Sequence, residues 1–171
     1  VLMPADDSID PWQQTPPAGA TTSFRRTALA NWMVDTEKGA GHLLARVIVN
    51  RLWHHHFGRG IVSSTNDFGI QGQPPTHPAL LDWLALQLIA NDWSLKHIHA
   101  LILSSYTYQQ SSEFDENNSQ IDPDNTYLWR FSPRRLEAEA IRDSILQATG
   151  QLDKTMFGKG TLDESMRRRS I

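Results

Sequence analysis

The 171-residue sequence contains no cysteine. The lack of thiols excludes disulfide bonds, thiolate zinc sites, cysteine nucleophiles and the C-x-x-C-H attachment of a c-type haem. No apolar run approaches the length of about eighteen residues that a membrane-spanning helix requires, so we expect no membrane span. The formal net charge is only −3. The chain therefore lacks the broad basic field that attracts nucleic acid, and we expect no nucleic-acid partner.

What the sequence does contain is enough apolar surface for a core, since 39% of its residues are hydrophobic. The densest apolar stretch spans residues 43–57, where apolar side chains recur at helical spacing and Gly58 can end the helix in the left-handed conformation. Arg46, Asn50 and Arg51 interrupt this stretch. Because polar side chains are rarely buried without partners, we expect acidic partners for the two arginines elsewhere in the fold.

Four further segments show apolar side chains at helical spacing. They span residues 24–36, 78–92, 95–106 and 134–149. The residues expected to begin them are Ser23, Thr76, Ser94 and Ser132, and prolines that favour a helix start, Pro78 and Pro133, lie near two of these positions. Gly150 is expected to end the last helix. No useful strand-like alternation is present. We predict an all-α fold of about five helices around a buried central helix at 43–57, with long irregular loops between them.

The ends of the chain have a different composition. Residues 1–22 are rich in proline and small polar residues, which predicts a linker or extended segment, and residues 23–171 are predicted to form one helical domain. The sequence starts without a methionine and stops at Ile171, just after a run of three arginines. We therefore expect a piece of a longer protein whose helical domain continues past the last residue.

Several strings together resemble a known family. They are NRLWHHHFGRG at 50–60, DFGIQGQPPTHPALLDW at 67–83, DWSLKHIHALILSSYTYQQSS at 92–112 and RRLEAEAIRDSIL at 134–146. In order and spacing they are similar to domain of unknown function 1553, which is found near the C-terminus of large secreted planctomycete proteins. The resemblance covers residues 23 to 153. The chain has Ala79 where the family usually has glutamate, so it lacks the capping box that this glutamate would form with Thr76.

The resemblance implies an architecture more than a reaction. It implies an exported protein, periplasmic or extracellular, with a role in polysaccharide use. It also implies neighbouring domains in the same chain, often of the c-type cytochrome class, so that any haem would lie in those domains and no cofactor in this one.

The histidines predict no metal site. His54, His55 and His56 are consecutive on a helix and fan out over about 200°, so all three cannot reach one ion. His97 and His99 are two residues apart on a helix and fail for the same reason.

The long connection at 58–78 is the first place to look for a polar site. Asn66, Asp67 and His77 could converge there with Arg51, with Asp67 or His77 acting as a general base. The alternative is that Asn66 and Asp67 organise turns and Thr76 caps a helix.

The last predicted helix carries Glu139 and Asp143 at i and i+4, which could form a catalytic carboxylate pair. Alternating charges on one helix face more often form a structural ion network. Such a network is predicted to comprise Arg46, Arg51, Arg135, Glu139, Arg142 and Asp143.

Two aromatic residues beside the polar segment 107–131, Tyr108 and Trp129, could stack on a saccharide ligand. Since no recognisable catalytic motif is present, the sequence favours a non-catalytic scaffold or interaction domain of a larger exported protein. Its expected partners are other domains of the same chain and polysaccharide. The alternative is a hydrolase acting on saccharides, with Asp67, His77 and Glu139 as its candidate catalytic residues.

Overall fold

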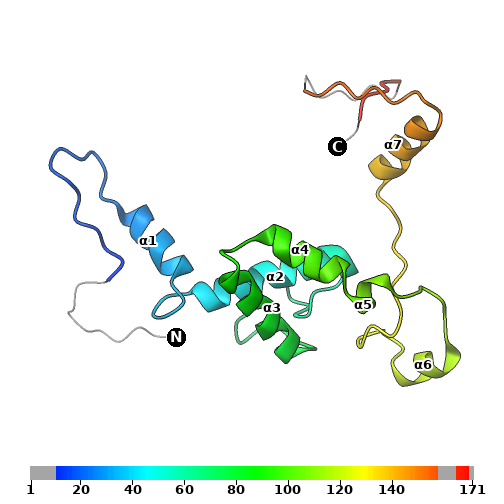
Figure 1. Ribbon diagram of the computed structural model, residues 1–171, viewed down its shortest axis with the longest axis horizontal. Helices are drawn as coiled ribbons and strands as arrows, with labels where there is room; N and C mark the ends of the chain where they lie inside the picture. Colours follow the sequence, from blue (N-terminus) through cyan, green and yellow to red (C-terminus); the bar gives the residue numbers. More distant parts are fainter. Residues whose placement is uncertain (1–10, 158–164, 170–171) are drawn as a thin grey trace. The chain divides into compact units, whose positions relative to one another are not determined.

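The computed structural model describes residues 11–157 and 165–169 (Figure 1). The described residues form seven helices and no strand. These are α1 (Arg25–Val34), α2 (Gly41–Phe57), α3 (Pro78–Ala90), α4 (Leu95–Leu103), α5 (Tyr106–Gln109), α6 (Glu116–Ile121) and α7 (Ala138–Ala148). The all-α prediction is confirmed. The chain divides into two compact units, one ending at Ser132 and the other beginning at Pro133. The predicted single domain at 23–171 stays a prediction, because each unit is described by itself.

The first unit is built around α2, which packs against α1, α3 and α4. The buried side of α2 consists of Ala45, Val49, Trp53 and Phe57, which recur at every fourth position and so share one helix face. The rest of the core comes from Leu81, Leu84, Ala85 and Leu88 of α3, Ile98 and Ile102 of α4, and Ile61 and Val62 of the following loop. The predicted buried central helix is therefore confirmed.

The ends of the helices test the predicted caps. Gly58 ends α2 in the left-handed conformation (φ 81°), and the Ser94 hydroxyl accepts the N–H of His97 at 3.3 Å to begin α4, both as predicted. Thr76 does not cap α3. Its hydroxyl donates instead to the carbonyl of Ile61 at 3.2 Å, and His77 occupies the cap position without a side-chain bond.

Two other predicted helix starts are wrong. Phe24, with φ 55°, replaces Ser23 as the residue that precedes α1. In the second unit α7 begins at Ala138 and not after Pro133, and Ser132 accepts a hydrogen bond from Asn125 at 2.9 Å. A hydroxyl that is engaged by a nearby turn competes with capping, which sequence spacing does not reveal.

Two short helices, α5 and α6, were not predicted. Their starts are capped by Ser105, which accepts the N–H of Tyr108 at 3.2 Å, and by Asp115, which accepts the N–H of Asn118 at 2.8 Å. Helices of four and six residues are too short to show an apolar period.

The corner between α3 and α4 is tight. Asn91 ends α3, and the next two residues, Asp92 and Trp93, both have left-handed backbones with φ of 52° and 58°. Trp93 packs against the core. Since each such non-glycine residue costs about 1–2 kcal/mol, packing must hold this corner in place.

The segment before α1 is tied to the helical unit. The Trp12 indole N–H donates to Asp35 Oδ2 at 2.7 Å. Hydrogen bonds from the N–H of Glu37, the Trp12 indole and the N–H of Lys38 lower the pKa of Asp35 below its ordinary 3.8. The first ten residues of the predicted linker at 1–22 lie outside the described residues. None of the helices in the described ranges has the length and apolar character to cross a membrane.

The second unit combines α7 with the chain that follows it. The Arg142 guanidinium lies 3.4 Å from the carboxylate of Asp143 and donates to the carbonyls of Met166 and Arg168. The N–H of Asp153 donates to the carbonyl of Arg167 at 2.8 Å. Arg142 thus joins α7 to residues 165–169.

Candidate functional site

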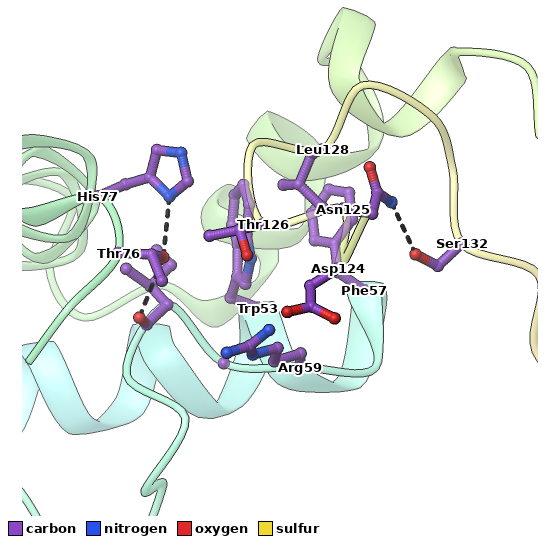
Figure 2. Close-up of a pocket in the computed structure, with 12 residues that line it drawn as sticks. Trp53, Phe57, Arg59, Thr76, His77, Asp124, Asn125, Thr126, Leu128 and Ser132 are labelled. Atoms are coloured by element: carbon purple, nitrogen blue, oxygen red, sulfur yellow. Dashed lines mark hydrogen bonds between the residues drawn. The ribbon is translucent and has the colours of Figure 1, made fainter. Parts of the chain in front are cut away.

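The first unit contains a small cavity of about 60 Å³ at the C-terminal end of α2. Twelve residues line it: Trp53, Phe57, Arg59, Gly60, Ile61, Thr76, His77, Asp124, Asn125, Thr126, Leu128 and Ser132. Figure 2 shows the cavity between the turn that carries Thr76 and His77 and the segment that carries Asp124 to Leu128. Two loops therefore form its walls, residues 58–77 (the first loop) and residues 110–132 (the second loop).

The apolar base of the cavity comes from α2. Trp53 and Phe57 lie one helical turn apart and stack with ring centroids 4.2 Å apart. Each is only 7% exposed. Because both rings belong to the core, the base of the cavity is rigid.

The first loop is held by an amide from α2. Asn50, which is fully buried, donates from Nδ2 to the carbonyl of Val62 at 3.0 Å and accepts the N–H of Val62 through Oδ1 at 2.8 Å. Gly60 makes this approach possible, since a Cβ there would lie 2.5 Å from the Val62 carbonyl oxygen and 2.8 Å from Asn50 Nδ2. We call this pair of hydrogen bonds the Asn50 clamp.

The second loop is held by its own residues. The buried carboxylate of Asp122 accepts the N–H groups of Thr126 and Tyr127 at 2.9 and 2.7 Å. Asn125, with φ 51°, donates to the carbonyl of Arg130 and to the Ser132 hydroxyl, both at 2.9 Å. The polar segment 107–131 therefore includes two buried side chains, Asp122 and Asn125, that fold the loop.

The cavity presents both acidic and basic groups. Asp124, Arg59 and His77 line it, and Figure 2 shows the Asp124 carboxylate and the Arg59 guanidinium on the same side. His77 Nδ1 lies 2.9 Å from the Thr76 hydroxyl, and its ring meets that of Tyr127 edge to face at 5.8 Å. A volume of this size holds a few water molecules or one small polar group, which these side chains can contact as donors and acceptors.

The predicted catalytic residues do not all reach this cavity. His77 lines it, whereas Asp67 does not. Asp67 Oδ1 accepts the N–H of Gly69 at 2.8 Å, and the Ser64 hydroxyl donates to the Asp67 carbonyl at 2.8 Å, so Asp67 organises a turn. Glu139 is an exposed residue in the first turn of α7, in the second unit.

Arg51 and Asn66 come together as the sequence suggested. Arg51 Nη2 donates to Asn66 Oδ1 at 3.1 Å, on an exposed surface. This bond links α2 to the first loop outside the cavity. It is a structural contact between two exposed side chains.

The acidic partner of Arg46 is one that the sequence did not single out. Arg46 Nη2 lies 2.6 Å from Asp82 Oδ1 of α3, and both side chains are about half exposed (45% and 49%). Arg142 and Asp143 are brought together in the second unit. A wider network that also includes Arg51, Arg135 and Glu139 stays a prediction.

The predicted stacking residues have rings engaged within the chain. Tyr108 meets the rings of His56, Phe57 and Phe131 edge to face, with centroids 5.5, 5.8 and 5.3 Å away. The Trp129 ring lies 4.9 Å from the guanidinium carbon of Arg130 and 6.1 Å from the Phe114 ring. These contacts occupy part of each ring, so stacking of a saccharide on Tyr108 or Trp129 stays a prediction.

Sequence reasoning missed Trp53, Arg59 and Asp124 as cavity residues. Trp53 lies in the predicted buried helix at 43–57, and it is buried. Asp124 lies in a run of turn-forming residues, and only the fold shows that this run meets the end of α2. The available signal was the dense group of Asp and Asn before Trp129, since such residues fold a chain back on itself.

Comparison with known proteins identifies the family of the chain but no individual relative. Residues 25–170 match the family described as PSD1, protein of unknown function (DUF1553). No curated protein and no solved structure matches the chain. Since the match covers well over half of the sequence, the chain belongs to the DUF1553 family.

Proposed function

We propose that this chain is a non-catalytic interaction domain of a larger exported protein and that α3 is its docking surface. The observation that carries the proposal is that the exposed face of α3 is apolar, although the polar side chains of Asp82 and Gln87 border it. Contiguous exposed apolar side chains of this kind are typical of a surface that contacts another protein. The exposed face therefore fits a helix that a further protein surface covers.

The exposed face of α3 is formed by Ala79, Trp83, Leu86 and Ala90, which share one side of the helix. Trp83 is 47% exposed and Leu86 is 52% exposed. The opposite side, with Leu84 and Leu88, is buried against the core. Covering the remaining surface of Trp83 and Leu86 would contribute roughly 1 kcal/mol each, which favours an apolar protein partner.

The family resemblance supports the setting of this proposal. It implies an exported protein with neighbouring domains and a role in polysaccharide use, so a neighbouring domain of the same protein is the partner we propose for α3. The turn-forming hydrogen bonds of Asp67 fit this role, because they give that carboxylate a structural task.

The test is hydroxyl-radical footprinting of tryptophan side chains in this chain alone and in the longer protein that contains it. Trp83 should be oxidised in the isolated chain and at least fivefold less in the longer protein. Trp53, which is buried within the unit, should stay protected in both samples and serves as the internal control. Equal oxidation of Trp83 in the two samples would contradict docking at α3.

One observation favours a saccharide hydrolase as a second candidate. His77 and Asp124 line the same cavity, which gives it a possible base and a carboxylate. A screen of oligosaccharides and polysaccharides for binding and for released reducing ends tests this function. Catalysis should be lost in His77→Gln and in Asp124→Asn but kept in Asp67→Asn, since Asp67 lies outside the cavity. A screen without cleavage rejects the candidate.

A further inference from the structure

Two histidines from different helices meet beside the core. His56 lies in the last turn of α2 and His99 lies in α4, and the distance between His56 Nε2 and His99 Nδ1 is 2.8 Å. We propose that this pair binds a late first-row divalent metal ion such as Zn²⁺ or Cu²⁺. Water or a donor group of a partner completes the coordination shell.

The chemistry of the pair suits this class of ion. Imidazole nitrogen is a common ligand of zinc, copper and nickel, whereas magnesium and calcium prefer oxygen. Two nitrogens bound tetrahedrally at about 2.0–2.1 Å from zinc lie about 3.3 Å apart. The pair is about half an ångström closer because the two nitrogens share a hydrogen bond, and the ion would replace that hydrogen bond as the two rings turn apart.

The position of the pair favours a cation. His56 is in the C-terminal turn of α2, where the helix dipole carries partial negative charge. The pair is half-buried, and the Tyr108 ring packs edge to face on His56 at 5.5 Å. These contacts restrict the rings and reduce the entropy that binding would cost.

The two helices that supply the ligands are firmly held. Phe57, next to His56, is 7% exposed, and Ile98, next to His99, is fully buried. Spacing along one helix ruled out a site at 54–56 or at 97–99, and it could not reveal a pair that is 43 residues apart in sequence.

Within the described ranges, no group of three or more histidine, cysteine or acidic side chains is arranged to hold an ion. The site therefore offers two protein ligands and at least two open positions. Such a site would bind with moderate affinity and could accept a carboxylate or imidazole from another molecule. Because a histidine ring binds a metal ion in its neutral form, the affinity of the pair for the ion should fall as the solution is acidified.

The first test is thermal unfolding of the whole chain with Zn²⁺, Cu²⁺ or Mg²⁺. Zn²⁺ and Cu²⁺ at about one hundred times their dissociation constants should raise the midpoint by about 5 °C or more, and Mg²⁺ should not. His99→Gln and His56→Gln should each abolish the rise. His54→Gln and His55→Gln are matched controls on the same helix and should retain it.

The second test reads the coordination directly and does not depend on the stability of the variants. Isothermal titration should give one ion per chain, with at least tenfold weaker binding in His99→Gln. The Cu²⁺ electron paramagnetic resonance spectrum should show two coupled nitrogens. Absence of binding, or binding that survives in His99→Gln and is lost in His54→Gln or His55→Gln, identifies an adventitious ion only and overturns the proposal.

Discussion

The two loops that enclose the cavity, the second of which includes the short helix α6, are held in different ways. The first loop (58–77) is fixed from outside by Asn50, a helix residue that lies 12 positions from its partner Val62. The second loop (110–132) is fixed from inside, because Asp122 and Asn125 bind groups only three to seven residues away. The buried hydrogen bonds from Asn50 therefore tie the first loop to the helical core, whereas those of the second loop stay within it, and Leu128 and Phe131 of the second loop pack against the core.

The largest expected effect is at the Asn50 clamp. Asn50→Ala leaves the N–H and the carbonyl of the buried Val62 without partners, which should lower the free energy of unfolding by about 3 kcal/mol. Urea unfolding at constant m-value measures the loss. Asn66→Ala removes one exposed hydrogen bond and should change stability by less than about 0.5 kcal/mol. A similar loss in both variants would remove the distinction between the buried clamp and a surface contact.

The corresponding residue of the second loop is Asp122. Asp122→Ala removes two charge-assisted hydrogen bonds to backbone N–H groups and should cost about 2 kcal/mol. We also expect a local effect: amide hydrogen exchange should accelerate across 122–132 and remain unchanged in the first loop. If exchange in the first loop accelerates equally, the second loop is not self-contained.

Gly60 tests the close approach on which the clamp depends. Gly60→Ala places a methyl group against the carbonyl of Val62 and the Asn50 amide, which should cost about 1–2 kcal/mol. Gly69→Ala in the same loop is the control, because its added Cβ would meet only Asp67 Oδ1 at 3.1 Å. Equal melting temperatures for the two variants would show that the first loop relaxes freely around Asn50.

Arg46 forms an ion pair outside both loops, and its substitution shows how much an exposed contact contributes to stability. Since the Arg46–Asp82 pair is half exposed, Arg46→Ala should cost no more than about 0.5–1 kcal/mol, and less at high salt. Unfolding in low and high sodium chloride measures both effects. A loss above about 3 kcal/mol would instead support the buried ion network predicted from the sequence.

The smallest effect concerns pH. Because hydrogen bonds lower the pKa of Asp35 in the folded chain, its contribution to stability is present above its ordinary value of 3.8 and is lost as the pH falls through the folded value. Carboxyl NMR titration should place the Asp35 pKa below 3.8, and Trp12→Phe should raise it. The pKa of Asp153, lowered by hydrogen bonds from Thr155, should not respond to that substitution.

The two loops also show what sequence can and cannot predict. Periodicity found the central helix and its end at Gly58, because apolar faces and left-handed glycine caps are local signals. The predicted helix caps at Thr76 and Ser132 are wrong, because these hydroxyls form hydrogen bonds with other groups in the folded loops. The predicted polar site at 58–78 supplied His77 to the cavity but not Asp67. The position of Asp124 in the cavity and the Asn50 clamp depend on tertiary contacts, which the spacing of residues in the sequence does not reveal.

The corner at Asn91–Trp93 has a consequence for how such a chain can vary. The α3–α4 connection contains two successive left-handed residues, and one of them packs on the core. An inserted or deleted residue would disrupt this conformation. Exposed turns in the two long loops can change length without moving the helices, as long as their anchoring side chains remain. Natural variation in length should therefore collect in those loops, while the α3–α4 hairpin keeps its residue count.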